Sequence, residues 1–112
     1  MMKYRVKSKI WIEVNDKVLL GKGRVNLLMA IEEIGSLSKA AKAIGMSYKK
    51  AWKLVDMMNE RADQPLVKLS VGGKGGGGAI LTDYGRSMVK VFEGLKKRCW
   101  NFLNAQAELT NL

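Results

Sequence analysis

Residues 70–82 read Ser-Val-Gly-Gly-Lys-Gly-Gly-Gly-Gly-Ala-Ile-Leu-Thr, which sets one lysine among six glycines between two short apolar runs. Upstream, residues 35–55 read Gly-Ser-Leu-Ser-Lys-Ala-Ala-Lys-Ala-Ile-Gly-Met-Ser-Tyr-Lys-Lys-Ala-Trp-Lys-Leu-Val, the pattern of two short helices joined by a turn. A helix-turn-helix followed by a β-ribbon with a glycine tip is the arrangement of a winged helix-turn-helix. Together the two stretches predict a mainly α fold with a small amount of β structure.

The charge of the chain indicates what kind of partner it binds. The chain has 112 residues, a hydrophobic fraction of 47% and a formal net charge of +10, which fit one folded domain over residues 1–112. A basic balance of this size favours a polyanion, either nucleic acid or an anionic lipid surface. Residues 36–74 hold eight Lys or Arg residues against three acids, so much of the excess lies in the predicted helix-turn-helix and wing.

The scarcity of cysteine and histidine limits which functional sites we expect in this chain. Cys99 is the only cysteine, so no intrachain disulfide forms and a reducing compartment is the simpler expectation. Histidine, the commonest general base and metal ligand, is absent. No apolar run reaches the roughly 18 residues of a membrane span, and no signal peptide is visible. We expect a soluble cytoplasmic protein that is not an enzyme and has no catalytic residue, cofactor or metal site.

The order of elements follows from apolar periodicity and from turn residues. Residues 8–20 alternate around an Asn-Asp-Lys turn and predict a β-hairpin. Residues 24–34 repeat at helical spacing and stop at Gly35. The remaining expected elements are a helix-turn-helix at 36–62, a wing at 66–82 and a long C-terminal helix at 83–107.

The helix-turn-helix makes specific demands that this sequence meets. Two closely crossing helices need a small contact residue, which Ala41 supplies, and the turn needs a residue that tolerates positive φ, which Gly45 supplies. The second helix presents polar residues at its N-terminal end, where they can reach the major groove. The predicted DNA-binding residues of the motif are Ser38, Lys39, Ser47, Tyr48, Lys49, Lys50 and Lys53. The alternative is an ordinary helical corner with a solvated lysine face. Trp52 is expected to lie in the core or to pack against a helix rather than to stack on bases.

The glycine loop does not match a nucleotide-binding loop. A Walker loop needs Gly-Lys followed by Ser or Thr at the start of a helix, whereas Lys74 is followed by Gly75 and then by a strand. A flexible linker without a binding role is the alternative interpretation of this loop, but the loop lies inside a predicted ribbon and not between domains. As a wing tip, the glycines let the backbone approach the sugar-phosphate surface and Lys74 adds a charge. We therefore expect Lys74, Gly75 and Gly76 to contact DNA.

These motifs resemble a known family over about residues 20–100. The stretches Gly35-Ser-Leu-Ser, Gly45-Met-Ser-Tyr-Lys and Gly72-Gly-Lys-Gly-Gly-Gly-Gly-Ala-Ile-Leu-Thr-Asp-Tyr-Gly are similar to the N-terminal DNA-binding domain of the ModE family, bacterial molybdate-responsive regulators related to LysR-type winged helices. The resemblance implies a homodimer that binds a palindromic operator. Full-length members carry C-terminal molybdate-binding domains, which we do not expect in this chain, so molybdate sensing is not carried over.

The last helix carries an apolar repeat spaced 4, 3, 4, 3, 4, 3 from Met88 to Leu109. Such a seam is typical of a helix that packs against a partner helix. The predicted dimer-interface residues are Met88, Phe92, Leu95, Cys99, Phe102 and Leu109, with Gln106 on the same seam. For Met88 and Phe92, packing against the domain's own core is an equal alternative.

The sequence thus predicts a sequence-specific regulator that binds double-stranded DNA as a homodimer on an inverted repeat. The alternative is a DNA-binding adaptor controlled by a partner protein. We expect no small-molecule effector site within the chain. An enzyme and a membrane-surface protein are less well supported, because the carboxylates are scattered and the lysines do not flank a strongly apolar face.

Overall fold

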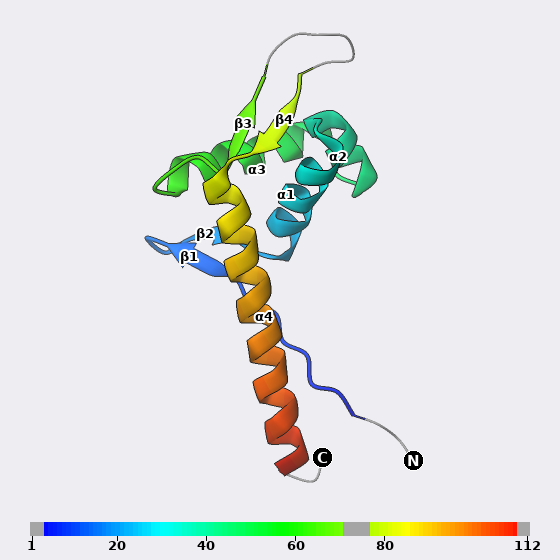
Figure 1. Ribbon diagram of the computed structural model, residues 1–112, viewed down its shortest axis with the longest axis vertical. Coiled ribbons are helices and arrows are strands. Elements are labelled where there is room, and N and C mark those ends of the chain that lie inside the picture. Colours follow the sequence, from blue (N-terminus) through cyan, green and yellow to red (C-terminus); the bar gives the residue numbers. More distant parts are fainter. Residues whose placement is uncertain (1–3, 71–76, 110–112) are drawn as a thin grey trace.

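The computed structural model describes residues 4–70 and 77–109 of the chain. Four helices and two small antiparallel ribbons are arranged around one core, and the last helix extends away from it (Figure 1). The mainly α winged helix-turn-helix fold with a long C-terminal helix is therefore confirmed. The elements are β1 (Ile12–Val14), β2 (Lys17–Leu20), α1 (Lys22–Ile34), α2 (Leu37–Ala43), α3 (Tyr48–Arg61), β3 (Val67–Leu69), β4 (Ala79–Leu81) and α4 (Asp83–Leu109).

The β1–β2 hairpin turns at two residues in the left-handed region. Asn15 and Asp16 have φ values of 51° and 64°, as a two-residue hairpin turn requires. Strand β2 then leads into α1, which ends at Gly35 with a φ of 77°. The hairpin and the glycine stop are as the sequence predicts, although α1 begins two residues earlier than expected.

The helix-turn-helix owes its tight geometry to caps at both sides of its turn. Helix α2 ends in a Schellman motif, in which the Met46 N–H donates to the Ala41 carbonyl at 2.9 Å and Gly45 has a φ of 70°. The hydroxyl of Ser47 then caps α3 by accepting from the Lys50 N–H at 3.1 Å. Ala41 is buried between the helices, so the small residue and the positive-φ glycine both serve as predicted.

The wing is fastened to α3 by one asparagine. The side-chain oxygen of Asn59 accepts from the Leu66 and Val67 N–H groups at 2.8 and 3.1 Å, and its amide nitrogen donates to the Val67 carbonyl at 2.9 Å. At the far end of β3, the Ser70 N–H donates to the Gly78 carbonyl at 2.9 Å. The base of the wing is thus fixed with respect to α3.

The start of α4 lies against Pro65 and Leu66, at the end of the loop that leads from α3 into β3. The Thr82 hydroxyl accepts from the Gly85 N–H at 2.9 Å and donates to the Pro65 carbonyl at 2.7 Å. A Cβ atom at Gly85 would collide with the Leu66 carbonyl, so only glycine lets α4 pass this close. The helix then continues to Leu109, two residues beyond its predicted end.

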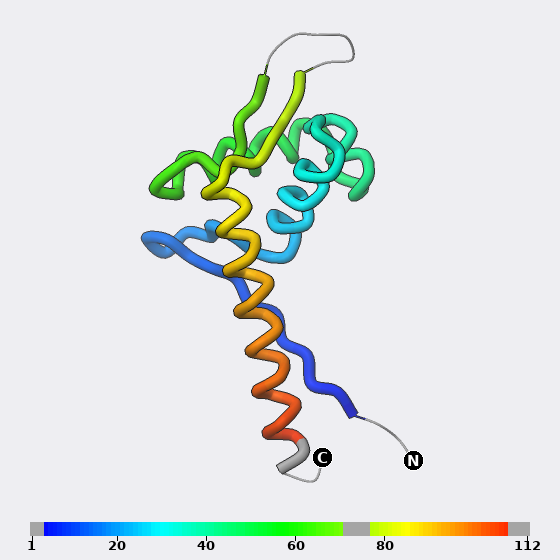
Figure 2. Tube along the Cα trace, in the orientation of Figure 1, coloured from blue at the N-terminus to red at the C-terminus, as the bar shows by residue number. Residues whose placement is uncertain are grey.

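An N-terminal segment, residues 4–10, runs beside the outer half of α4 (Figure 2). The Asn104 side chain both accepts from the Val6 N–H at 2.8 Å and donates to the Val6 carbonyl at 2.9 Å. The Trp100 indole N–H donates to the Ser8 carbonyl at 2.9 Å. No sequence pattern predicted this pairing, because it depends on two side chains that meet an irregular backbone.

Part of the predicted dimer seam on α4 is buried within the chain itself. Phe92 is only 2% exposed, so it fills the core of its own chain and is not available to a partner helix. Met88 packs against the same core, and Cys99 lies 3.3 Å from the Ser8 hydroxyl under the N-terminal segment. For Met88 and Phe92 the structure therefore shows the alternative of packing against the domain's own core, while the sequence did not show that residues 4–10 return beside Cys99.

Candidate nucleic-acid interface

The N-terminal end of α3 presents a cluster of basic side chains to solvent. Lys49, Lys50 and Lys53 are all exposed, and with Ser47 they surround a surface hollow of about 240 Å³. Four of the predicted DNA-binding residues therefore lie together. The hydroxyl of Ser47 is already engaged as the helix cap, which leaves the lysines to provide the charge.

The charge on α3 changes sign along its length. The lysines occupy its first two turns, while the exposed acids Asp56 and Glu60 lie further along. The partial positive charge of the helix N-terminus adds to that of the lysines. The first half of α3 therefore attracts phosphate groups more strongly than the second half.

Two aromatic side chains stand beside these lysines. Tyr48 is 56% exposed, and Trp52, one turn later, is 47% exposed. This exposure contradicts the expectation that Trp52 lies in the core. The inward stripe of α3 is formed by Ala51, Val55 and Met58, and a residue next to Ala51 on the helix points away from that stripe. That spacing was the signal that could have placed Trp52 on the interface.

The start of α2 lies beside the base of the wing. The Ala79 N–H donates to the Gly35 carbonyl at 3.1 Å, and Ser36 and Gly78 form an isolated antiparallel bridge. Ser36 is the helix cap, accepting from the Lys39 N–H at 3.3 Å, while Ser38 is exposed. The structure thereby places the first turn of α2, which carries predicted residues Ser38 and Lys39, next to the base of the wing.

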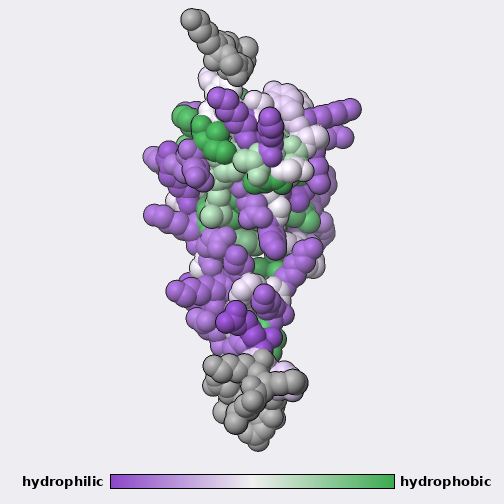
Figure 3. All heavy atoms as spheres, turned by 90° about the vertical axis from the view of Figure 1, so that its right-hand side faces the viewer, coloured by the Kyte–Doolittle hydropathy of each residue, from purple (hydrophilic) through white to green (hydrophobic). Residues whose placement is uncertain are grey.

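The wing strands add exposed groups that the sequence analysis did not single out. Lys68 of β3 pairs with Ile80 of β4 in the register of the ribbon, and both are exposed. The predicted tip residues Lys74, Gly75 and Gly76 lie outside the described residues. Figure 3 shows the side of the molecule that carries α2, and hydrophilic residues cover most of it.

A separate exposed apolar strip runs along α4. Val91, Leu95 and Phe102 are 47%, 40% and 62% exposed and recur at helical spacing on one face. Of the predicted dimer residues, Leu95 and Phe102 therefore lie on an open face, and Val91 is an addition. The side chain of Leu109 lies outside the described residues.

The geometry agrees with a known family. A model of the bacterial regulatory helix-turn-helix proteins of the lysR family matches residues 23–86, more than half of the chain. The chain belongs to the lysR family. The match runs from α1 through the wing to the first turn of α4, so it includes every element of the basic surface described above.

Several relatives are similar to this lysR-family chain. It is 38% identical over 107 residues to the molybdenum transport protein ModE of Azotobacter vinelandii, covering 96% of this chain and 40% of that protein. It is 39% identical over 82 residues to the DNA-binding transcriptional dual regulator ModE of Escherichia coli K12, covering 73% and 31%. It is 39% identical over 93 residues to the molybdenum-pterin-binding protein MopB of Rhodobacter capsulatus, covering 83% and 34%. The chain thus spans well under half the length of these curated relatives.

These comparisons confirm that the lysR-family chain resembles the ModE proteins and carries the helix-turn-helix unit of a DNA-binding regulator. The family and the Escherichia coli relative are regulatory proteins by name. Within the described residues, no helix is long and apolar enough to cross a membrane. The same residues contain no group of three or more Cys, Asp or Glu side chains placed to hold a metal ion.

Proposed function

We propose that this chain is a sequence-specific, cytoplasmic transcriptional regulator that binds double-stranded DNA as a homodimer on an inverted-repeat operator. The observation that best supports this proposal is the lysine cluster at the capped N-terminal end of α3. The Ser47 cap fixes the start of the helix that carries Lys49, Lys50 and Lys53, and lysines at that end suit a recognition helix that enters the major groove.

The aromatic pair next to the lysines supports sequence-specific reading. Lysines facing phosphates provide affinity that is independent of sequence, whereas contacts to base edges and to the thymine methyl group distinguish sequences. Tyr48 and Trp52 supply apolar surface for such contacts, and Lys49 and Lys53 supply donors. We propose that these four side chains read bases, that Ser38 and Lys39 fix the register through the backbone, and that Lys74, Gly75 and Gly76 contact the flanking sugar-phosphate surface.

The exposed strip on α4 supports the homodimer. Val91, Leu95 and Phe102 form an apolar line on a helix that projects beyond the core (Figure 1). A two-fold axis lets the same strip on two copies cover itself, which is the usual solution for such a surface. Two recognition helices would then meet major-groove faces separated by one duplex turn, about 34 Å, or a multiple of it.

The experiment that tests the proposal is selection of bound fragments from random duplex DNA, followed by sedimentation of the complex. The expected result is an enriched inverted repeat bound by two chains. Enrichment of no sequence, or of a single half-site bound by one chain, would contradict it. Repeating the selection with the Lys49→Ala variant shows whether the enriched positions depend on α3.

A further inference from the structure

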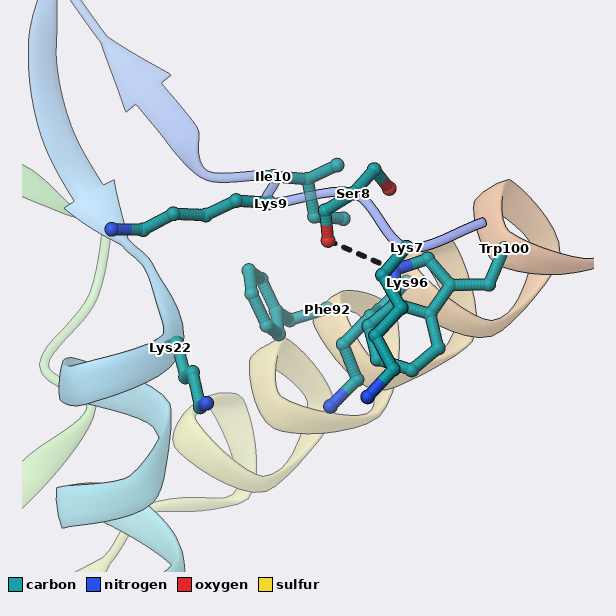
Figure 4. Close-up of a pocket in the computed structure, with 8 residues that line it drawn as sticks. All are labelled: Lys7, Ser8, Lys9, Ile10, Lys22, Phe92, Lys96 and Trp100. Carbon is teal, nitrogen blue, oxygen red and sulfur yellow. Dashed lines mark hydrogen bonds between the residues drawn. The ribbon is translucent and has the colours of Figure 1, made fainter. Parts of the chain in front are cut away.

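A basic cavity lies between the N-terminal segment, the first turn of α1 and the middle of α4. Its volume is about 560 Å³, within the range of small-molecule sites. Four lysines line it, two from the N-terminal segment and one from each helix, namely Lys7, Lys9, Lys22 and Lys96. Figure 4 shows the ring of Phe92 between the Lys22 side of the cavity and the side formed by Lys96 and Trp100.

The charges around this cavity are not balanced from within. No carboxylate is among the residues that line it. In the described part of the chain, Lys7, Lys9 and Lys22 form no ion pair, and Lys96 pairs with Glu93 at 3.2 Å. These lysines come from three separate segments, and Figure 4 shows the Lys9 ammonium group directed away from those of Lys7 and Lys96. A multiply charged anion would lower the repulsion among the lysines that face the cavity.

Trp100 holds two of these lysines in place. The Nζ atoms of Lys7 and Lys96 lie 6.0 and 5.7 Å from the centroid of its ring, within the range of a cation–π contact. The ring itself is fixed, because its N–H donates to the Ser8 carbonyl at 2.9 Å. These two side chains are therefore ordered before any anion arrives, which lowers the entropic cost of binding one.

The cavity is remote from the DNA-binding surface. Lys22 stands at the start of α1, whereas the wing base contacts Gly35 just beyond the end of that 13-residue helix, about 20 Å away at 1.5 Å per residue. Lys96 lies 13 residues beyond the start of α4 at Asp83, which repeats that separation. A duplex held by α3 and the wing would not supply the anion for this cavity.

We propose that the cavity binds a small oligophosphate, a free anion with two or more linked phosphate groups. One tetrahedral ion cannot reach charges that come from three segments around a space of this size, while a chain of phosphates can. The bound anion would link residues 4–10 to α1 and α4. The inference stands apart from DNA binding, since none of the four lysines lies on α2, α3 or the wing.

Titration calorimetry of the full chain with inorganic tripolyphosphate tests the proposal, with sodium sulfate at matched ionic strength as the reference anion. The expected result is saturable binding of one tripolyphosphate per chain, with an accompanying rise in melting temperature, and no comparable binding of sulfate. The cavity variant Lys9→Gln with Lys22→Gln removes two charges without touching the Trp100 stack. It should weaken binding about tenfold or more, since each lysine offers a charge-assisted contact.

Two matched variants, each removing two lysines, serve as controls. Lys49→Gln with Lys53→Gln alters the DNA-binding surface, and Lys17→Gln with Lys90→Gln alters neither site; both should keep tripolyphosphate binding. Equal weakening in all three pairs would mean a general charge effect and would overturn the site. Loss confined to the Lys49 and Lys53 pair would place the anion on the DNA-binding surface, and no saturable binding would mean that the cavity is not a site.

Discussion

Asn59 on α3 uses its side-chain amide to bind both the N–H and the carbonyl of Val67 on β3, at 3.1 and 2.9 Å. The same oxygen accepts from the Leu66 N–H, and Leu66 and Val67 are both buried. A single side chain thus joins the helix that carries the lysines to the strand that carries the wing. The angle between the two is set inside the protein, before any DNA is present.

Replacing Asn59 with Ala should destabilise the chain by about 1–3 kcal/mol, because it leaves buried backbone groups without partners. Urea unfolding measures the change. Asn26→Ala, at an exposed position of α1, is the matched control and should change stability by less than about 0.5 kcal/mol. Equal effects of the two substitutions would show that the Asn59 contacts contribute nothing to the fold.

Alanine at Lys49, Lys50 or Lys53 should weaken DNA binding without altering the melting temperature, since all three side chains are exposed. A lysine on phosphate should lower the slope of affinity against salt by about one, and a lysine on a base should cost about 1–3 kcal/mol at one position of the operator. Fluorescence anisotropy over a salt series distinguishes the two. Unchanged affinity in all three variants would remove α3 from the interface, with Lys17→Ala on the hairpin as control.

Trp52→Ala should reduce affinity for the selected operator more than affinity for random duplex, because apolar contact with bases discriminates between sequences. Its stability should change little, as the side chain is half exposed. Trp11, which is similarly exposed but lies on the hairpin side, provides the comparison through Trp11→Ala. If both substitutions left operator affinity unchanged, Trp52 would not touch DNA.

Phe102→Asp should convert the dimer to monomer and lower operator affinity steeply, because it places a charge in the proposed α4 interface. Phe102 is exposed in the single chain, so the fold itself should survive. Sedimentation at micromolar concentration gives the oligomeric state, and Asn101→Asp on an exposed neighbouring position is the control. A wild-type monomer that still binds an inverted repeat tightly would show that the α4 strip does not form the dimer.

Two glycine-to-alanine substitutions should change the stability of the chain in opposite directions. Gly85→Ala should destabilise the chain, because its Cβ would collide with the Leu66 carbonyl and push α4 away from the wing. Gly23→Ala, in the first turn of α1 with nothing within 4 Å of the new methyl group, should stabilise it by about 0.4–1 kcal/mol. Thermal unfolding of the two variants measures both signs, and a neutral Gly85→Ala would mean that the helix can shift without cost.

The sequence predicted the parts of the fold that depend on local chemistry. Gly35, Gly45 and Ser47 each occupy the stop, turn or cap that their residue type indicates. The features that it could not predict depend on contacts between segments that lie far apart in the sequence. Phe92 fits a heptad seam as well as it fits a core, and the pattern alone cannot tell the two apart.

The functional surfaces likewise include residues that the sequence could predict and residues that it could not. The lysines of α3 were predictable because cap and periodicity fix which positions face solvent. The pairing of Val6 with Asn104 and the basic cavity were not, since nothing in residues 4–10 has a period that matches α4. Trp52 was misplaced because its size suggested burial, although the helical spacing pointed outward.

Helix α4 acts mechanically as a long rigid arm. With 27 residues it is about 40 Å long; its first turn passes tightly against Leu66 at Gly85, and its outer half is bonded to residues 4–10. A tilt of about 10° near that point would swing the far end by about 7 Å, roughly a fifth of the ~34 Å rise of one turn of DNA. In the proposed dimer, a small tilt at the root of the arm would therefore change the spacing between the two recognition helices.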